Sequence, residues 1–219
     1  MANNNLELIF ILDASGSMHG LEQDTIGGVN RILEEQKKIQ NGGTVYVTSV
    51  TFNNKTRTLH DRLRLEEIQP LTEKEYCTQG CTALYDAIGE TVEKISNIHK
   101  YIRAEDVPDK TLCVIMTDGM ENASRRYYRE EVLKGIEERK AKGWEFLFLA
   151  ANVEAAEYAE SLGIEQERAI DFCADKEGLD IVCDCVENVM HEMRLGGAYS
   201  REAFKKADAL YQKRKGNKK

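Results

Sequence analysis

Three stretches of this sequence are apolar almost from end to end, and they constrain the fold more than any other feature. They are Leu6–Leu12, Thr111–Thr117 and Trp144–Ala150. Strands that are buried on both faces have this character, and they belong to parallel sheets covered by helices. Segments with apolar residues at helical spacing lie between them, at Leu21–Gln40, Ala83–Arg103 and Arg129–Lys142. The alternation predicts an α/β protein with a doubly wound, mostly parallel sheet and helices on both faces.

Further elements follow from local patterns. The β-branched and aromatic run Thr44–Phe52, the pair Asn53–Asn54 and the run Lys55–Leu63 together predict a hairpin. Thr72 and Glu75 form a capping-box pattern for a short helical turn. Three more elements are expected towards the end of the chain: a helix capped by Asn152 and ending before Gly163, a short edge strand at Ala169–Cys173, and a last core helix starting at Asp175.

Composition sets the broad class. Hydrophobic residues make up 42% of the 219-residue chain and charged residues 31%, which fits a globular protein rather than a disordered or fibrous one. The opening "MANNNLELIF" has neither the basic region nor the apolar core of a signal peptide, and no apolar run is long enough to span a membrane. We therefore expect a cytoplasmic protein that does not engage membranes.

The six cysteines do not form a recognisable metal site. Cys77 and Cys81 are separated by three residues, and Cys183 and Cys185 by one, so neither is the CxxC pair expected of structural zinc, and only four histidines could add ligands. Cys113 lies inside an apolar run and is expected in the core. Reduced thiols are the expectation for a cytoplasmic chain.

Charge is distributed unevenly along the chain. Residues 194–219 carry nine Lys or Arg and two Asp or Glu, a net charge of +7, and the total of −8 leaves −15 for residues 1–193. We predict a domain over 1–195 and, over 196–219, a basic accessory helix with a mobile end. Gly196 and Gly197 break the preceding helix, Ser200 offers an N-cap, and an apolar stripe follows at Ala203, Phe204, Ala207, Leu210 and Tyr211. Nucleic-acid binding by this segment is disfavoured, because no aromatic or glycine-rich motif accompanies the charge.

A set of oxygen-bearing residues follows the strand ends. Asp13 ends the first apolar run and is followed by Ser15 and Ser17; Thr82 precedes a long helix, and Asp118 follows another central strand. In open parallel sheets the carboxyl ends of strands meet at one rim, where ligands bind. Two carboxylates and three hydroxyls suit a hard divalent cation, with Mg²⁺ favoured and Mn²⁺ or Ca²⁺ also fitting. One coordination position would remain for water or for a carboxylate from a partner.

"DASGS", the downstream "GCT" and "TDG" together resemble the von Willebrand factor type A domain and its metal ion-dependent adhesion site, in the form of its stand-alone bacterial members. The matching residues are Asp13, Ser15, Ser17, Thr82 and Asp118, and the order of elements agrees from Leu6 to about Met190. The resemblance implies a Rossmann-like sheet with one antiparallel edge strand. It also implies a magnesium-dependent protein-binding module in which an acidic residue of the partner completes the ion's coordination.

Other readings of these residues stay open. Each hydroxyl alone could cap a helix or turn. The alternative function is a hydrolase with an ion-activated water, which requires a general base. Only Glu121 and His19 are candidates for that base, so we do not expect an enzyme; a solvated loop position is the simpler interpretation of Glu121, and exposure or rim contact that of His19. Cys81, beside Thr82, is interpreted as a packed thiol without an activating base.

Overall fold

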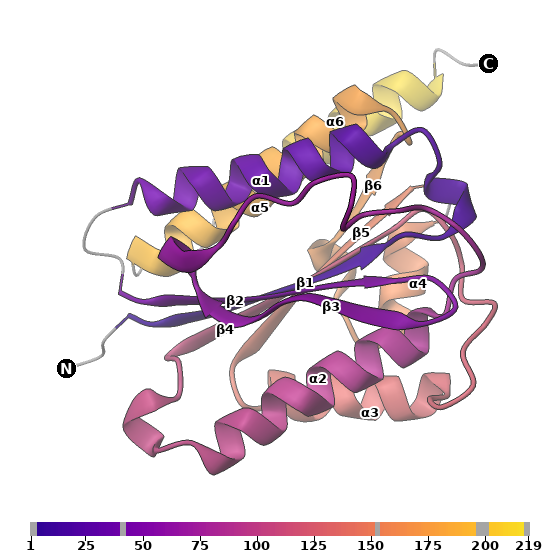
Figure 1. Ribbon diagram of the computed structural model, residues 1–219. Helices are drawn as coiled ribbons and strands as arrows, with labels where there is room; N and C mark the ends of the chain where they lie inside the picture. Colours follow the sequence, from indigo (N-terminus) through magenta and orange to yellow (C-terminus); the bar gives the residue numbers. More distant parts are fainter. Residues whose placement is uncertain (1–3, 40–42, 152–153, 196–201, 217–219) are drawn as a thin grey trace.

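A computed structural model describes residues 4–39, 43–151, 154–195 and 202–216 of the chain. Its centre is one six-stranded sheet in the order β3-β2-β1-β4-β5-β6 (Figure 1). The strands are β1 (Leu6–Asp13), β2 (Val45–Phe52), β3 (Thr56–Arg64), β4 (Lys110–Thr117), β5 (Trp144–Ala151) and β6 (Ala169–Phe172). All neighbouring pairs are parallel except β2 and β3, which are antiparallel. The predicted mostly parallel sheet with one antiparallel edge strand is confirmed.

Helices cover both faces of the sheet (Figure 1). One face carries α1 (Glu22–Lys37), α5 (Lys176–Leu195) and α6 (Glu202–Gly216); the other carries α2 (Leu84–Tyr101), α3 (Arg129–Lys140) and α4 (Ala155–Ser161). Short 3-10 turns lie at Gly16–Met18, Leu65–Glu67, Ala104–Asp106 and Gln166–Arg168. None of the described helices is both long and apolar enough to cross a membrane.

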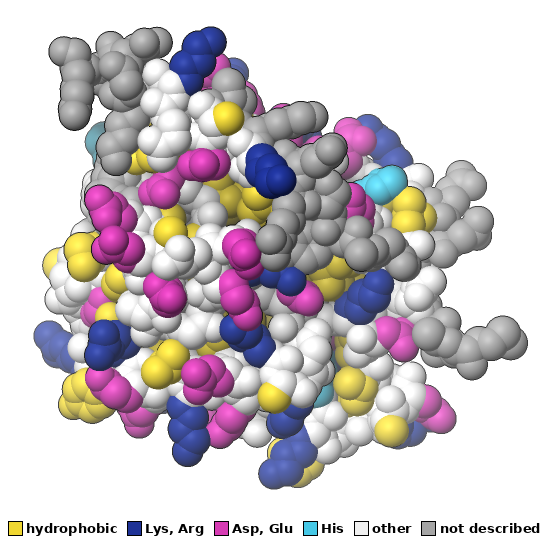
Figure 2. Space-filling model, turned by 180° about the vertical axis from the view of Figure 1, so that it is seen from behind, with side chains coloured by type: hydrophobic (Ala, Val, Ile, Leu, Met, Phe, Trp, Pro, Cys, Tyr) yellow, Lys and Arg dark blue, Asp and Glu magenta, His cyan; other side chains and the backbone are white. Residues whose placement is uncertain are grey.

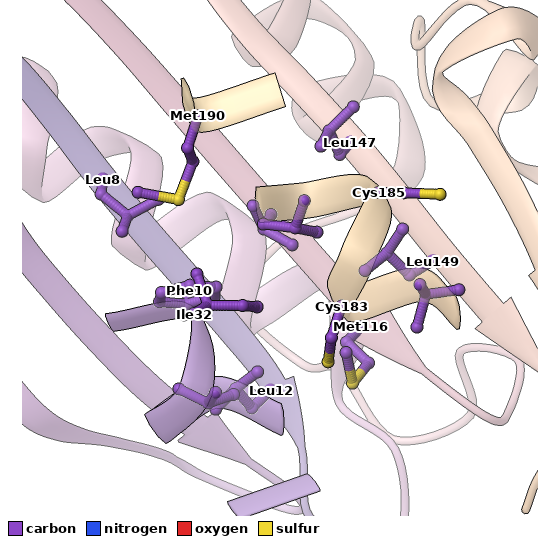
Figure 3. Packing of buried hydrophobic residues seen from close by; sticks show 14 of the residues in the cluster. Leu8, Phe10, Leu12, Ile32, Met116, Leu147, Leu149, Cys183, Cys185 and Met190 are labelled. Carbon is purple, nitrogen blue, oxygen red and sulfur yellow. The ribbon is translucent and has the colours of Figure 1, made fainter. Parts of the chain in front are cut away.

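Strand β1 lies at the middle of the sheet and shows why the central strands are apolar throughout. Every residue of β1 is buried. Leu8 and Phe10 point to the face of α1 and α5, where they pack near Ile32 and Met190 (Figure 3). Because successive side chains alternate between the two faces, Ile9 and its neighbours on the other face must also be apolar to pack against α2.

Local signals place most boundaries within a few residues of those predicted. The hairpin between β2 and β3 turns where Asn53 donates its backbone N–H to the carbonyl of Lys55. Gly143 and Gly163 follow α3 and α4 with φ angles of 85° and 80°, values that an L-residue rarely adopts. Asp175 accepts a hydrogen bond from the Gly178 N–H at the start of α5, as a capping residue does. Asn152, Gly196, Gly197 and Ser200 lie outside the described residues.

The short turn predicted at Thr72 forms. Glu75 accepts hydrogen bonds from the backbone N–H and the hydroxyl of Thr72, so the capping-box contact forms. The Thr72 carbonyl accepts from the N–H groups of Glu75 and Tyr76, which closes the turn, and the Tyr76 side chain is buried in the core.

The C-terminal helix α6 packs against β6 and α5. Phe204 is 8% exposed and Ala207 2% exposed, and both belong to the same apolar cluster as Phe172 and Leu179. Tyr211 is half-buried; the side chains of Ala203 and Leu210 lie outside the described set. The apolar stripe thus contacts the body of the same chain, and the boundary at 195 stays a prediction.

Arg194, the first of the basic residues counted at the end of the chain, is not exposed. Its guanidinium is buried and donates to the backbone carbonyl of Gln36, which ties the end of α5 to the end of α1. Burial lowers the pKa of this guanidinium. Elsewhere acidic side chains are spread over the face seen in Figure 2, interspersed with Lys and Arg.

All six cysteines are free thiols. Cys113 is buried, as predicted, and so are Cys183 and Cys185. Cys81 and Cys77 are exposed, so the interpretation of Cys81 as a packed thiol is wrong: its segment runs along the surface, where the Cys81 N–H is held by Asn54.

Candidate metal centre

The candidate site lies at the carboxyl ends of β1 and β4, which are neighbours in the sheet. The chain leaves β1 through α1 on one face and leaves β4 through α3 on the other. This reversal of winding opens a crevice beyond the two strand ends. Asp13 is the last residue of β1, and Asp118 immediately follows β4, so the topology alone brings these two carboxylates to one rim.

A chain of short hydrogen bonds joins the serines to Asp118. The Ser17 hydroxyl donates to Asp118 Oδ1 at 2.6 Å, and the Ser15 and Ser17 hydroxyl oxygens are 3.0 Å apart. A hydroxyl has one proton, and that of Ser17 is directed at Asp118, so Ser15 is the donor to Ser17. The backbone N–H of Ser15 donates to Asp13 Oδ1 at 2.7 Å, which curls the loop back over the end of β1.

Both carboxylates are withdrawn from solvent. Asp13 is 0% exposed and Asp118 4% exposed. Burial raises the pKa of each carboxyl, and the charge of Asp118 adds to the rise at Asp13; hydrogen bonds from Thr117 and Ser15 to Asp13, and from Ser17 to Asp118, oppose it. A cation placed between the two carboxylates would remove this penalty, because it stabilises their ionised form.

Thr82 reaches the same rim from the loop before α2. Its backbone N–H donates to Asn122 Oδ1 at 2.9 Å, and its carbonyl accepts from the Asn122 N–H at 3.0 Å. A Cβ built on Gly119 would lie 3.5 Å from Thr82 Oγ1 and 3.7 Å from Ser17 Oγ, so the two hydroxyls flank Gly119. Thr82 is buried, and its hydroxyl makes no hydrogen bond among the described residues. That hydroxyl is therefore open to a ligand.

Two glycines let the first two loops approach closely. The Gly16 N–H donates to the Gly80 carbonyl at 3.0 Å, and a Cβ on Gly16 would lie 3.3 Å from that oxygen. Gly80 has a φ of 76°, and a Cβ there would lie 2.1 Å from Asn54 Oδ1. Gly16 itself does not have a positive φ, so the close approach of the two backbones accounts for a glycine there.

The donors suit a small, hard cation. In an octahedral Mg²⁺ site with bonds of 2.0–2.1 Å, adjacent ligand oxygens are about 2.9 Å apart. The spacings of 2.6 Å from Ser17 Oγ to Asp118 Oδ1 and 3.0 Å to Ser15 Oγ are of this size. Both oxygens of Asp13 already accept a hydrogen bond, from Ser15 and Thr117, which favours contact between Asp13 and an ion through water. No group of three His, Cys, Asp or Glu side chains suited to a metal occurs among the described residues, so the hydroxyls are essential to this donor set.

Glu121 was interpreted as a solvated loop residue, and that interpretation is wrong. One carboxylate oxygen of Glu121 accepts from the N–H groups of Ala123 and Ser124; the other accepts from the Ser124 hydroxyl and from the Tyr85 N–H at the start of α2. Glu121 thereby fastens the loop after β4 to the helix after Thr82. The Tyr85 N–H that the carboxylate accepts from lies 36 residues away in the sequence, where no local pattern indicates it.

The roles of Thr117 and Asp86 at this rim were not predicted from the sequence. Thr117 donates from its hydroxyl to Asp13 Oδ2 at 2.6 Å and so holds that carboxylate in place. Asp86 accepts from three consecutive backbone N–H groups, those of Arg125, Arg126 and Tyr127. A carboxylate in the first turn of α2 is the signal that could have indicated this anchoring role. His19 is 84% exposed and lies 3.1 Å from Glu22, in agreement with its predicted exposure.

Comparisons with known proteins identify the fold. No family model matches the sequence, and no curated protein matches it. Among solved structures, the von Willebrand factor domain of the type V pilus tip protein Mfa5 from Porphyromonas gingivalis superimposes with a TM-score of 0.62 at 10% identity, covering 91% of this chain and 98% of that one. The pilus adhesin SpaC from Lactobacillus rhamnosus GG gives 0.64 at 12% identity, over 84% of this chain and 30% of that chain.

A third match is proximal thread matrix protein 1 from the mussel byssus, in a structure described as having a zinc-occupied MIDAS motif. It gives a TM-score of 0.57 at 14% identity over 88% of this chain. This chain spans 46% and 47% of the length of the mussel protein in two other crystal structures, and 64% of that of the PilB minor pilin from Streptococcus sanguinis. At such identities the likeness concerns architecture. The chain has the fold of the von Willebrand factor type A domain.

Proposed function

We propose that this protein is a divalent-metal-dependent protein-binding module. The ion, with Mg²⁺ favoured, is held by Asp13, Ser15, Ser17, Thr82 and Asp118, some of them through water. A carboxylate of the partner protein completes the coordination. The observation that carries the proposal is the convergence of three loops on one rim, with the Ser17 hydroxyl 2.6 Å from Asp118 and 3.0 Å from Ser15.

The chemistry of the donors supports the choice of ion. The set contains two carboxylates and three hydroxyls and no nitrogen or sulfur ligand. Hard cations such as Mg²⁺ prefer oxygen ligands, whereas Zn²⁺ prefers imidazole and thiolate. Two carboxylates balance a charge of +2 and the hydroxyls add none, so a coordination position that these residues leave open can still accept an anion. A carboxylate from a partner provides that anion and gains charge-to-charge attraction at a partly buried site.

The similar solved structures favour binding over catalysis. Three of them are pilus proteins, described as an adhesin, a tip protein and a minor pilin, and the mussel protein is described with zinc in its MIDAS motif. The hydrolase alternative needs a base to activate water. Glu121 has both oxygens engaged by N–H and O–H donors, and His19 pairs with Glu22 at the surface, so neither is placed for that role.

The proposal is tested in two steps with the full chain. Calorimetric titration of chelator-treated protein should show one saturable Mg²⁺ site, and Asp13→Ala should abolish it while the circular dichroism spectrum keeps its α/β form. Proteins captured from a lysate in Mg²⁺ should then be released by chelator. Tight Mg²⁺ binding by Asp13→Ala would place the ion elsewhere. Capture that withstands chelator would contradict metal-dependent binding.

A further inference from the structure

A cavity of about 330 Å³ lies at the end of the sheet opposite to the proposed ion site. Its walls are the last turns of α2, the chain that enters β4 and the turn that leads into β5. The ion site, in contrast, lies where β1 and β4 end. The cavity has the size of a small pocket for an organic ligand. None of the five proposed ligands of the ion lines it.

Two buried polar groups in the wall of this cavity have no partner. Trp144 is 7% exposed and Thr111 3% exposed, and they are neighbours in the pairing of β4 with β5. The indole N–H of Trp144 and the hydroxyl of Thr111 make no hydrogen bond with a described residue, and neither atom is shut off from solvent by the protein. Both groups therefore open into the cavity that these side chains line. Because a donor without an acceptor costs free energy at a buried position, a ligand that brings an acceptor here is stabilised.

The wall around Trp144 is held in one arrangement. The indole lies edge-on to the ring of His99, with centroids 5.5 Å apart, and is stacked beside Phe146 at 6.2 Å. His99 Nε2 is in turn 3.1 Å from the buried Glu7 Oε2. The same oxygen accepts from Arg62 Nε at 3.0 Å, so the charge of Glu7 is offset by a guanidinium and does not exclude an anion from the cavity.

The opening of the cavity has an excess of positive charge. Lys100 and Lys142 both line it and are exposed, and neither forms an ion pair with a described residue. Asp109 supplies a carboxylate to the lining, and one of its oxygens already accepts from the Asn5 N–H at 2.9 Å. Residues 1–193 carry a net charge of −15, so a pair of unpaired ammonium groups beside a cavity is unusual for this chain and attracts an anion.

We propose that this cavity binds a small aromatic anion. The ring packs against Trp144 and the buried Pro108. A polar atom on the ring accepts hydrogen bonds from the Trp144 N–H and the Thr111 hydroxyl, and the anionic group faces Lys100 and Lys142. The inference is independent of the proposed function, because no residue of the ion site takes part in it.

The probe for the test is 4-hydroxybenzoate, which has a phenolic oxygen at one end of a ring and a carboxylate at the other. Calorimetry and protein fluorescence should both show saturable binding to the full chain, with the same affinity in Mg²⁺ and in chelator. Trp144 is the only tryptophan of the chain, so a change in its emission places the probe at this cavity. Two compounds should bind more weakly: 4-hydroxybenzamide, which has no charge, and benzoate, which has no phenolic oxygen.

Variants separate the contribution of the charge from that of the hydrogen bond. Lys100→Gln with Lys142→Gln should weaken 4-hydroxybenzoate binding by roughly 2- to 25-fold and leave that of 4-hydroxybenzamide unchanged, since each exposed charge pair changes affinity by roughly 1.4- to 5-fold. Thr111→Val keeps the shape of the side chain and should weaken 4-hydroxybenzoate by roughly 2- to 13-fold but not benzoate. The matched control is Lys55→Gln with Lys74→Gln, two exposed lysines towards the other end of the sheet.

The control should bind 4-hydroxybenzoate within about twofold of wild type. Strands of eight residues separate the two ends of the sheet by about 26 Å, which exceeds the Debye length at physiological salt. Equal losses in the two double-lysine variants, or equal affinity of wild type for 4-hydroxybenzoate and its amide, would overturn the proposal. Binding without a change in Trp144 emission, or no binding at all, would do so as well. Each of these failures would leave the proposed metal-dependent function standing.

Discussion

The Ser17 hydroxyl donates a hydrogen bond of 2.6 Å to Asp118, although 101 residues separate them in the sequence. The contact exists because β1 and β4 are adjacent and parallel, so the loops that follow them meet. It ties the two acidic loops of the candidate site together without a metal. A ligand that binds both loops therefore finds them close to the required spacing, and less ordering is needed on binding.

Asp118→Asn should have opposite effects on stability with and without Mg²⁺. In metal-free protein it removes a buried charge that faces Asp13, so the free energy of unfolding should stay equal or rise by about 1 kcal/mol. With saturating Mg²⁺ the variant should be the less stable protein, because wild type gains RT ln(1 + [Mg²⁺]/Kd) and the variant gains little. Urea denaturation with and without chelator measures both. A variant that Mg²⁺ stabilises as much as wild type would exclude Asp118 as a ligand.

The mostly parallel sheet and the meeting of Asp13 with Asp118 at one rim could be predicted because they depend on burial and connectivity. A strand buried on both faces must be apolar at every position, as β1 is, and such strands adjoin in parallel sheets. Once the strands are ordered, their carboxyl ends lie at one rim. The role of Glu121 could not be predicted, since its acceptor sites are filled partly by Tyr85, which is distant in sequence.

The contacts at the end of the chain could not be predicted either, because they also join residues that are distant in the sequence. The apolar stripe of α6 was apparent from the sequence. The surface that it packs against could have been the body of the same chain, a second copy or a partner. Only the packing of Phe204 and Ala207 beside Phe172 identifies the body. Arg194 was counted with the basic residues of the chain's end, whereas the structure ties its guanidinium to a carbonyl at the end of α1.

Mg²⁺ affinity should fall as pH decreases, and it should do so at a higher pH than for ordinary aspartates. Burial and mutual repulsion raise the pKa of Asp13, and burial raises that of Asp118, so protons compete with the ion from above the usual value of 3.8. In metal-free protein the folded state then binds more protons than the unfolded state just above 3.8, and stability falls as pH rises through that window. Calorimetry in buffers of different ionisation enthalpy at mildly acid pH should detect protons released by Mg²⁺. An absence of proton release there would contradict the raised pKa values.

Gly80→Ala should weaken both folding and Mg²⁺ binding. The φ of 76° disfavours alanine by about 1–2 kcal/mol. The new Cβ would lie 2.1 Å from Asn54 Oδ1, so Asn54 must turn away and lose its hydrogen bond from the Cys81 N–H, which loosens the loop before Thr82. Gly143→Ala is the matched control, because its φ is 85° and a Cβ there meets nothing within 4 Å. The control should lose about the same backbone energy and keep its Mg²⁺ affinity. Equal Mg²⁺ affinity in both variants would mean that the Gly80 loop does not position a ligand.

Glu121→Gln distinguishes an anchor from a ligand. As an anchor, Glu121 holds donors from Tyr85, Ala123 and Ser124, and the amide replaces one acceptor oxygen by a donor. The free energy of unfolding should fall by about 1–3 kcal/mol in metal-free protein, because buried donors lose a charged partner. Thermal unfolding in the presence of chelator measures this loss. A variant of unchanged metal-free stability and strongly reduced Mg²⁺ affinity would instead identify Glu121 as a ligand.

Phe204→Ala and removal of residues 196–219 test the boundary at 195 together. The side chain of Phe204 is 8% exposed in a cluster that includes Phe172, so Phe204→Ala should lower the free energy of unfolding by about 3 kcal/mol. Truncation removes the Ala207 contact as well and should be at least as destabilising. Both proteins should keep wild-type Mg²⁺ affinity, since α6 packs on β6 and α5, whereas the ion site lies beyond β1 and β4. A truncated chain that fails to fold, while Phe204→Ala folds, would place α6 within the domain and move its boundary beyond residue 195.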